Sequence, residues 1–113
     1  MVTYRNNLSI TPAGAPLRIY LNQNDANFSL VFDLYTVTGE FTMESGSTVK
    51  MTGRHWGGTE FTKTGTYSGK TVTIAGDKTL TAVAGESLAE ITIIHSGKQL
   101  STANFILVIE PKA

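Results

Sequence analysis

Apolar and polar side chains alternate in one short segment after another of this chain. In segment 28–35, FSLVFDLY, every second residue from Phe28 to Leu34 is large and apolar. Successive side chains of a β-strand point to opposite faces of a sheet, so the alternation predicts a strand with one buried face. No window sustains the i, i+3, i+4, i+7 spacing of an amphipathic helix. The pattern therefore predicts an all-β fold.

Strand-like segments recur along most of the chain. Besides 28–35, the predicted strands are 17–21, 47–56, 60–67, 70–75, 87–95 and 99–110. Glycine-containing dipeptides separate several of them: Thr38-Gly39, Ser45-Gly46, Gly57-Gly58, Ser68-Gly69 and Ser96-Gly97. We expect 60–67 to pair with 70–75 around the turn at Ser68-Gly69. About seven short strands joined by such turns are typical of a sandwich, so we expect an immunoglobulin-like antiparallel β-sandwich.

The phase of the alternation predicts which side chains fill the core. In the last predicted strand, Phe105, Leu107 and Ile109 share one face, although the chain ends at Ala113. Apolar residues so close to the end indicate that this strand pairs inside a sheet. The predicted core residues are Leu30, Phe32, Leu34, Ile91, Ile93, Phe105, Leu107 and Ile109.

Two segments lack the alternation. Residues 1–16 contain two of the three prolines, and we expect them to form an extended N-terminal arm that is not packed against the sandwich of residues 17–113. Segment 76–86, GDKTLTAVAGE, is expected to cross from one sheet to the other, with or without one helical turn. The 113 residues fit a single domain.

Composition excludes several classes of partner and site. The chain has 9 basic and 9 acidic residues, so it offers no field that would attract nucleic acid or an anionic membrane. The absence of cysteine excludes disulfides, thiolate metal sites and a cysteine nucleophile. No secretory signal is visible, and no window approaches the roughly 20 apolar residues of a membrane span.

No catalytic, metal or cofactor site is expected from the spacing of titratable residues. His55 and His95 lie on separate predicted strands, and neither has a second ligand at i+2 to i+4. Glu40 and Glu44 flank a turn and are better explained as solvated residues than as a catalytic pair. No GxSxG motif appears, although a Ser–His–Asp arrangement stays open because it depends on the fold. Asp25 alone supplies too little charge for a tight calcium site.

The most unusual polar cluster is GRHWGG, which contains Arg54, His55 and the only tryptophan, Trp56. Three interpretations are open. Trp56 caps the open end of the core, which we favour, or it belongs to a protein interface, where Trp and Arg are enriched. In the third, Trp56, His55 and Tyr67 bind carbohydrate, because an aromatic ring can stack on a sugar.

The order of motifs resembles a known family. LRIYLNQND, LVFDLY, ESGSTVKMTG, SGKTVTI, TAVAGE and STANFILVIEP follow one another between Leu17 and Pro111. In this order they resemble the N-terminal domain of the phage baseplate upper protein family, and TAVAGESLAEI with STANFILVIE is the most specific part. Similar domains also begin phage head fibres. The HWGGTEF stretch departs from the polar, Asp-Gly-containing turn of the family, which leaves the role of Trp56 open.

The resemblance implies a non-enzymatic adaptor in a tailed-phage virion, assembled in the host cytoplasm and working by contact with baseplate, fibre or capsid proteins. It also implies a homo-oligomer, expected to be a trimer, with no cofactor. Relatives continue beyond the closing strand into a receptor-facing part, so Pro111 is expected to mark a junction, and receptor recognition is not carried over. The candidate interface residues are Tyr4, Leu8, Ile10, Pro12, Arg54, His55 and Trp56. The rival from another class is a carbohydrate-binding module.

Overall fold

The computed structural model describes residues 1–12 and 14–112, and it consists almost entirely of β-strands. Its elements are β1 Val2–Ser9, β2 Leu17–Asn22, β3 Phe28–Thr36, β4 Gly39–Glu40, β5 Thr48–Arg54, β6 Glu60–Thr64, β7 Thr66–Ser68, β8 Thr71–Gly76, α1 Lys78–Thr81, β9 Gly85–His95, β10 Lys98–Ser101 and β11 Phe105–Glu110. Within the described ranges, no helix has the length and apolar character needed to cross a bilayer.

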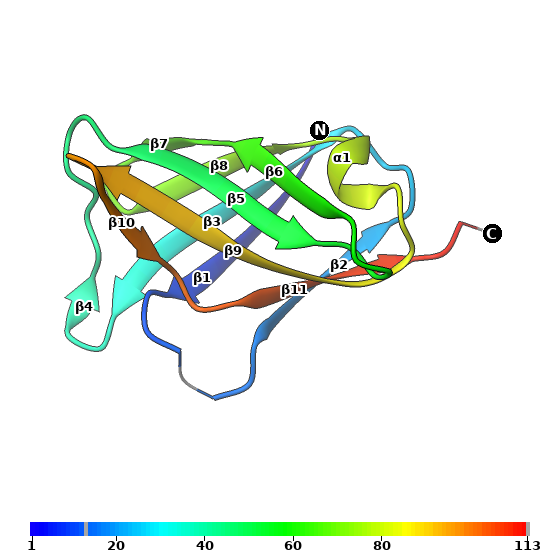
Figure 1. Cartoon of the computed structure of the whole chain (residues 1–113), viewed down its shortest axis with the longest axis horizontal. Coiled ribbons are helices and arrows are strands. Elements are labelled where there is room, and N and C mark those ends of the chain that lie inside the picture. The colour runs from blue at the N-terminus through cyan, green and yellow to red at the C-terminus, as the bar shows by residue number, and fades with distance from the viewer. Residues whose placement is uncertain (13, 113) are drawn as a thin grey trace.

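The strands form two sheets that pack face to face (Figure 1). Sheet A has the order β1-β3-β8-β7, with the short β4 beside β3. Sheet B has the order β2-β11-β9-β5-β6, with β10 beside β9. This arrangement confirms the predicted all-β sandwich.

The sheets are mixed, which corrects the expectation of an antiparallel sandwich at two strand pairs. β1 pairs with β3 in parallel, and β2 pairs with β11 in parallel. The chain leaves sheet A after β1, forms β2 in sheet B and then returns to sheet A as β3. The chain reverses its direction at each of these two crossings, so β3 runs parallel to β1.

The described chain has eleven strands instead of about seven, and two predicted strands are each divided. The predicted strand 99–110 is broken at 102–104, which separates β10 from β11. The predicted strand 60–67 is broken at Gly65, so β6 pairs with β5 in sheet B and only β7 pairs with β8 in sheet A. The expected pairing of 60–67 with 70–75 therefore holds only for the β7 part.

Gly65 lets the chain pass from one sheet to the other. A Cβ atom at this position would lie 2.5 Å from Cδ1 of Ile74 and 2.9 Å from the carbonyl oxygen of Thr73. The Gly65 N–H donates to the Val49 carbonyl at 2.9 Å. This crossing ties the sheets together along the β6 and β7 side of the sandwich. On the opposite side, the terminal strands β1 and β2 each pair with one neighbour in their own sheet.

The N-terminal segment is extended, as expected, but it is packed, which corrects the expected arm. Residues of β1 pair with β3 from Val2 opposite Phe28 to Ser9 opposite Tyr35. Leu8 faces the core and is 3% exposed. Asn6 occupies an inward position of β1, opposite Phe32, and this polar residue interrupted the alternation that would have revealed the strand. Residues 10–12 and 14–16, which include both prolines of this segment, lie between β1 and β2.

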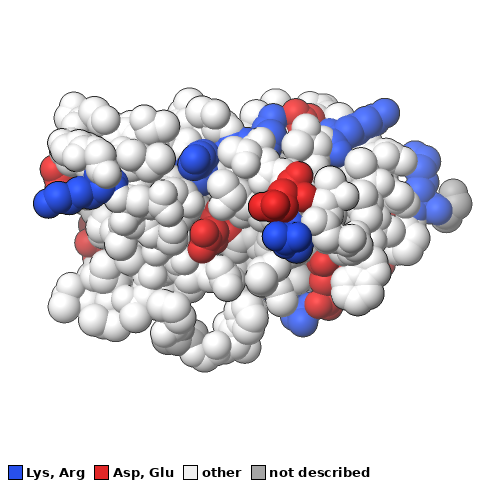
Figure 2. Space-filling model, in the orientation of Figure 1, with Lys and Arg blue, Asp and Glu red and all other residues white. Residues whose placement is uncertain are grey.

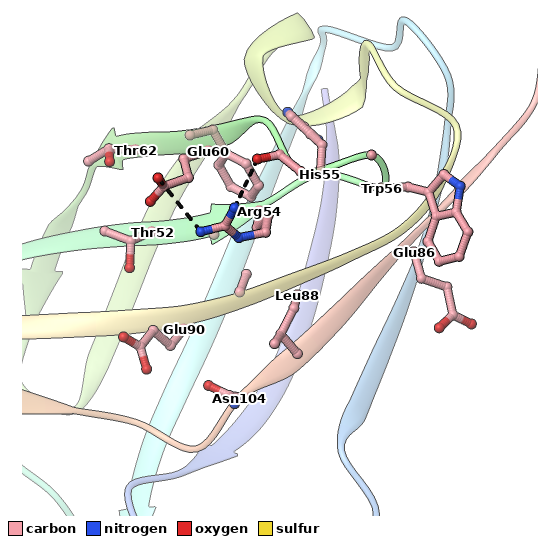
Figure 3. A pocket seen from close by; sticks show the side chains of 15 residues that line it. Thr52, Arg54, His55, Trp56, Glu60, Thr62, Glu86, Leu88, Glu90 and Asn104 are labelled. Atoms are coloured by element: carbon pink, nitrogen blue, oxygen red, sulfur yellow. Dashed lines mark hydrogen bonds and ion pairs between the residues drawn. The ribbon is translucent and has the colours of Figure 1, made fainter.

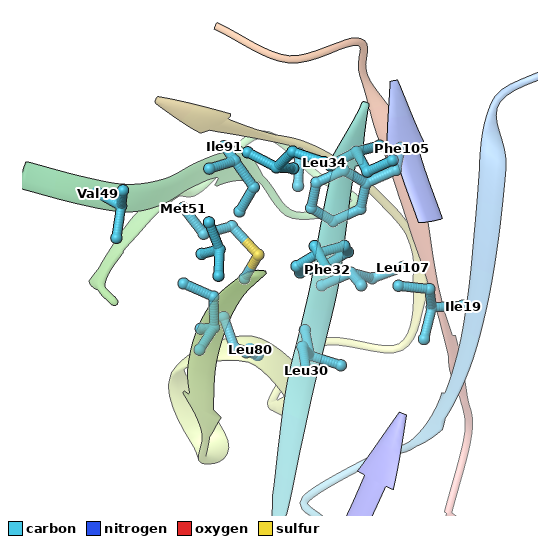
Figure 4. Close-up of a cluster of buried hydrophobic side chains, with 14 of the residues drawn as sticks. Ile19, Leu30, Phe32, Leu34, Val49, Met51, Leu80, Ile91, Phe105 and Leu107 are labelled. Carbon is cyan, nitrogen blue, oxygen red and sulfur yellow. The ribbon is translucent and has the colours of Figure 1, made fainter. Parts of the chain in front are cut away.

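The core lies between the two sheets (Figure 4). The rings of Phe32 and Phe105 meet near its centre, with centroids 4.9 Å apart. All eight residues predicted for the core are buried: Leu30, Phe32, Leu34, Ile91, Ile93, Phe105, Leu107 and Ile109.

The crossing predicted at 76–86 contains one helical turn, α1, between β8 in sheet A and β9 in sheet B. Asp77 caps this turn, because its carboxylate accepts the Thr79 N–H at 2.9 Å. Leu80 from the same turn is fully buried and closes one end of the core. The crossing is therefore part of the packed structure.

Candidate interaction surface around Trp56

The turn between β5 and β6 has a fixed backbone. Gly57 and Gly58 have φ angles of 97° and 102°, which glycine adopts without steric cost. The His55 N–H donates to the Thr59 carbonyl at 2.8 Å, and the Gly58 N–H donates to the His55 carbonyl at 2.9 Å. The Arg54 guanidinium donates to the Gly58 carbonyl at 3.0 Å. The GRHWGG motif is therefore a closed turn held by three hydrogen bonds.

His55 points inward and is only 6% exposed. Its Nε2 lies 2.9 Å from the Thr79 carbonyl oxygen and its Nδ1 lies 3.2 Å from Oγ of Ser87. A carbonyl only accepts, so Nε2 carries a proton and donates it to Thr79, while Nδ1 shares the second hydrogen bond with the Ser87 hydroxyl. The ring also lies 4.6 Å from that of Phe61. His55 cannot reach a partner, which corrects its place among the predicted interface residues.

The contact between His55 and Ser87 has the atoms of a serine–histidine pair but not the access that catalysis needs. The Ser87 side chain is completely buried, so no substrate can approach its hydroxyl without unfolding the start of β9. A carbonyl oxygen, that of Thr79, orients the imidazole. The pair therefore joins parts of the fold and does not form an accessible nucleophile.

Trp56 points away from the core and is 68% exposed, so the favoured interpretation, in which it caps the core, is wrong. The neighbouring residue His55 fills that end of the sandwich instead. Gly85 lies under the tryptophan: a Cβ atom there would be 2.8 Å from Cβ and 2.9 Å from Cγ of Trp56. A glycine at 85 lets the two backbones approach while the indole remains in solvent.

An open groove of about 600 Å³ lies beside the turn on the outer face of sheet B. Leu88 projects from β9 between its walls and is 51% exposed (Figure 3). Arg54 and Glu60 line one side, with 3.7 Å between Nη2 and Oε1. Glu90 and Asn104 line the other side. The groove thus combines an apolar floor with polar walls of both charges.

The charges on this face of the molecule are scattered and of both signs (Figure 2). Blue and red side chains alternate over the surface, and large areas between them are uncharged. This distribution agrees with the neutral composition, which gives no reason to expect nucleic acid as a partner.

Three of the four candidate interface residues of the N-terminal segment belong to the core or pack against it. Leu8 is buried, so its prediction as an interface residue is wrong. Because β1 pairs with β3, the side chain of Leu8 points into the core. Tyr4 and Ile10 are half-buried and pack against the core. Pro12 is exposed in the connection from β1 to β2. Tyr4, Leu8 and Ile10 therefore contribute to packing of the sandwich.

Sequence reasoning missed two exposed apolar residues on the outer face of sheet B. Tyr20 on β2 is 58% exposed and Leu88 on β9 is 51% exposed. Both occupy the outward phase of a predicted strand, where the alternation leads one to expect a polar residue. An apolar residue at an outward position was therefore the signal in the sequence that could have identified Tyr20 and Leu88 as exposed.

The three residues of the carbohydrate hypothesis are not assembled. Tyr67 is half-buried on β7, where its hydroxyl donates to the Glu44 carbonyl and accepts the Ser47 N–H, each at 3.1 Å. It is not among the residues that line the groove. Because His55 is buried as well, only Trp56 of the three can contact a ligand at this surface.

Glu40 and Glu44, the two carboxylates that flank the turn, each pair with a different partner. Glu40 forms an ion pair with Lys70, and the Glu44 carboxylate lies 2.9 Å from Nε2 of His95. Among residues 1–12 and 14–112, no group of three His, Cys, Asp or Glu side chains could hold a metal ion.

A scan of known family models gives no match to this chain, and no curated protein sequence matches it. Among solved structures, the chain is similar to the N-terminal domain of phage TP901-1 ORF48. The two superpose with a TM-score of 0.71 and 18% sequence identity, over 97% of this chain and 99% of the other. This likeness is one of fold, and it extends over nearly the whole of both chains.

Proposed function

We propose that the chain is a non-enzymatic structural domain of a tailed-phage particle that joins other virion proteins by protein–protein contact. The observation that carries the proposal is the end-to-end similarity of fold to the N-terminal domain of a phage protein. The order of motifs from Leu17 to Pro111 supports the same family of particle proteins independently of the fold. In this proposal the protein is located in the virion and is assembled in the host cytoplasm.

The contact surface that we propose consists of Arg54, Trp56 and Leu88. Trp and Arg are the side chains that most often dominate the binding energy of protein interfaces. The turn that carries Trp56 is already ordered by its hydrogen bonds, so little conformational freedom is lost when a partner binds. We favour a baseplate or fibre protein as the partner; attachment to the capsid, as a head fibre or decoration protein, is the alternative.

The proposal is tested on purified particles of the phage whose genome encodes the chain. Mass spectrometry and immunogold labelling should detect the protein in intact particles, and Trp56→Ala should reduce its incorporation at least tenfold. Tyr35→Ala is the matched control, because Tyr35 is also an exposed aromatic residue, at 43%, but lies on sheet A. Particles that never contain the protein, or equal effects of both substitutions, would contradict the proposal.

A carbohydrate-binding module is the second candidate function, and the exposure of Trp56 favours it. The indole stands at a groove whose other wall carries Glu90 and Asn104, which can bind sugar hydroxyls. Trp56 is the only tryptophan, so its fluorescence reports binding directly. Titration with bacterial cell-wall polysaccharide should shift the emission if this function holds, and Trp56→Ala should abolish binding measured by calorimetry. No shift at millimolar sugar would exclude it.

The proposal also includes self-association, since particle proteins act in multiple copies. Three copies is the expectation that the resemblance implies. Sedimentation of the isolated domain at high concentration measures the number directly.

A further inference from the structure

The edge of sheet B at β2 is open. β2 is the terminal strand of this sheet and pairs on one side only, with β11. At the end of this pair the Gln23 N–H donates to the Glu110 carbonyl at 2.9 Å. In a parallel pair, alternate residues direct both main-chain groups to the same neighbour. Residues 19 and 21 therefore face β11, and Arg18, Tyr20 and Asn22 direct their N–H and C=O groups to the open edge.

This edge lacks the devices that usually prevent strands from pairing with other chains. Natural edges carry lysine, proline or a bulge. The β2 sequence, LRIYLN, contains no lysine or proline. Its one charge, on Arg18, is held by Glu86 of β9, with 2.7 Å between Nη1 and Oε2. Because β9 lies beyond β11, this ion pair turns the guanidinium back over the sheet and away from the edge.

Tyr20 gives the same edge an apolar side chain. It is 58% exposed on the outer face of sheet B, beside its register partner Val108. An exposed aromatic residue on a terminal strand is suited to contact with another chain, since a large apolar area is buried when a strand is added.

We propose that β2 of a second copy pairs with this edge in antiparallel orientation, about a two-fold axis at Tyr20. In this register Tyr20 lies opposite the Tyr20 of the second copy, and Arg18 lies opposite Asn22. No like charges face each other, and the two tyrosine rings are neighbours. The two B sheets become one continuous sheet, and the interface is self-complementary, as a two-fold requires.

The main-chain groups at the edge can form this pairing. Three hydrogen-bonded residue pairs supply about six N–H···O=C bonds. The Asn22 carbonyl already accepts the Asp25 N–H at 3.2 Å, and its second lone pair remains for the second copy. The pairing closes with two copies, whereas the resemblance implied three. This inference rests on the self-association in the proposed function, but its test does not depend on any virion protein.

Cysteine cross-linking tests the register, because the chain has no cysteine of its own. Residues in a hydrogen-bonded antiparallel pair have Cα atoms about 5.5 Å apart, within the range that a disulfide spans. Oxidised Tyr20→Cys should form a covalent dimer in more than half of the chains. Leu88→Cys is the matched control, because Leu88 is similarly exposed on the same face but lies two strands from the edge. Equal cross-linking of both variants would overturn the register.

Charge pairing at position 20 tests the two-fold symmetry. The unmodified domain should sediment as a dimer, and Tyr20→Lys and Tyr20→Glu should each sediment as monomers, because like charges then face each other. An equimolar mixture of the two variants should form dimers again. Leu88→Lys controls for a charge on the same face and should remain dimeric, and unchanged melting curves show that the variants fold.

A monomeric or trimeric unmodified domain, or a mixture of the two variants that stays monomeric, would overturn the inference. A monomeric Tyr20→Lys variant that still enters phage particles would leave the proposed attachment intact. The failure of one proposal is therefore distinguishable from the failure of the other.

Discussion

The Nδ1 atom of His55 lies 3.2 Å from Oγ of Ser87, and both side chains are buried. Through its other nitrogen the same ring contacts the Thr79 carbonyl at 2.9 Å. One imidazole thereby joins the turn after β5, the helical turn α1 and the start of β9. Trp56 follows directly in the chain, so this buried contact fixes the backbone from which the exposed indole projects.

We predict that His55→Phe lowers the free energy of unfolding by about 1–3 kcal/mol for each of the two polar groups that lose their partner. Phenylalanine keeps an aromatic ring against Phe61 but leaves the Ser87 hydroxyl and the Thr79 carbonyl unpaired. Urea melts measure the loss. Adding Ser87→Ala should restore part of it, because the unpaired hydroxyl is removed; purely additive losses would contradict the hydrogen bond.

Phe105→Ala should lower the free energy of unfolding by about 3–5 kcal/mol. The ring is completely buried and packs on Phe32 at the centre of the core, so its removal leaves a cavity. Ile106→Ala is the adjacent control: Ile106 is half-buried and points to the outer face of sheet B, so its loss should be clearly smaller. Similar losses in denaturant melts would show that the two faces of β11 are assigned incorrectly.

Gly65→Ala should destabilise the fold by about 1–3 kcal/mol, because overpacking forces the backbone to shift. The added Cβ would meet the Thr73 carbonyl oxygen at 2.9 Å, and a backbone atom cannot move aside as a flexible side chain can. Thr66→Ala, at the next and exposed position, should change stability little. Thermal melts compare the two; a stable Gly65→Ala variant would mean that the crossing has more room than the structure shows.

Stability should decrease in acid partly through Asp77. The hydrogen bond from Lys63, with 2.7 Å between Nζ and Oδ2, is the main cause that lowers the pKa of this carboxyl below its usual value, and Thr79 adds to it. A carboxyl with a lowered pKa contributes stability above its unfolded pKa of about 3.9, and loses that contribution as the pH falls through the folded value.

The test of this pH dependence is Asp77→Asn, because asparagine can still cap α1 but carries no charge for Lys63. At pH 7 the variant should be less stable than the unmodified domain. The difference should shrink as the pH falls from about 4 towards 2. A difference that stays constant over this range would contradict the role of the ion pair.

Two properties of the sequence make opposite predictions for Trp56: the alternation of β5 places it outside, and its hydrophobicity places it in the core. Continuing the alternation of β5 from Val49 and Met51 places positions 53 and 55 on the inward face, and the structure agrees. Gly53 at this inward position leaves space for Phe61, since a Cβ atom there would lie 2.5 Å from its ring. The strand period therefore indicated that His55 is inside and Trp56 outside. Tryptophan is more hydrophobic than histidine, and this difference favoured the opposite assignment, with Trp56 inside and His55 outside.

The sequence by itself determined most of the strands and the faces that they bury, because a period of two residues is a local property. The lack of this period also marked the crossing at 76–86. Tertiary structure decided which strands are neighbours and in which direction they run. It made β1 a partner of β3, divided the strand at Gly65 between two sheets and left β2 with an open edge. These features depend on contacts between residues far apart in the chain, and no local pattern records them. The groove beside Trp56 arises in the same way, from strands that meet only in the folded sheet.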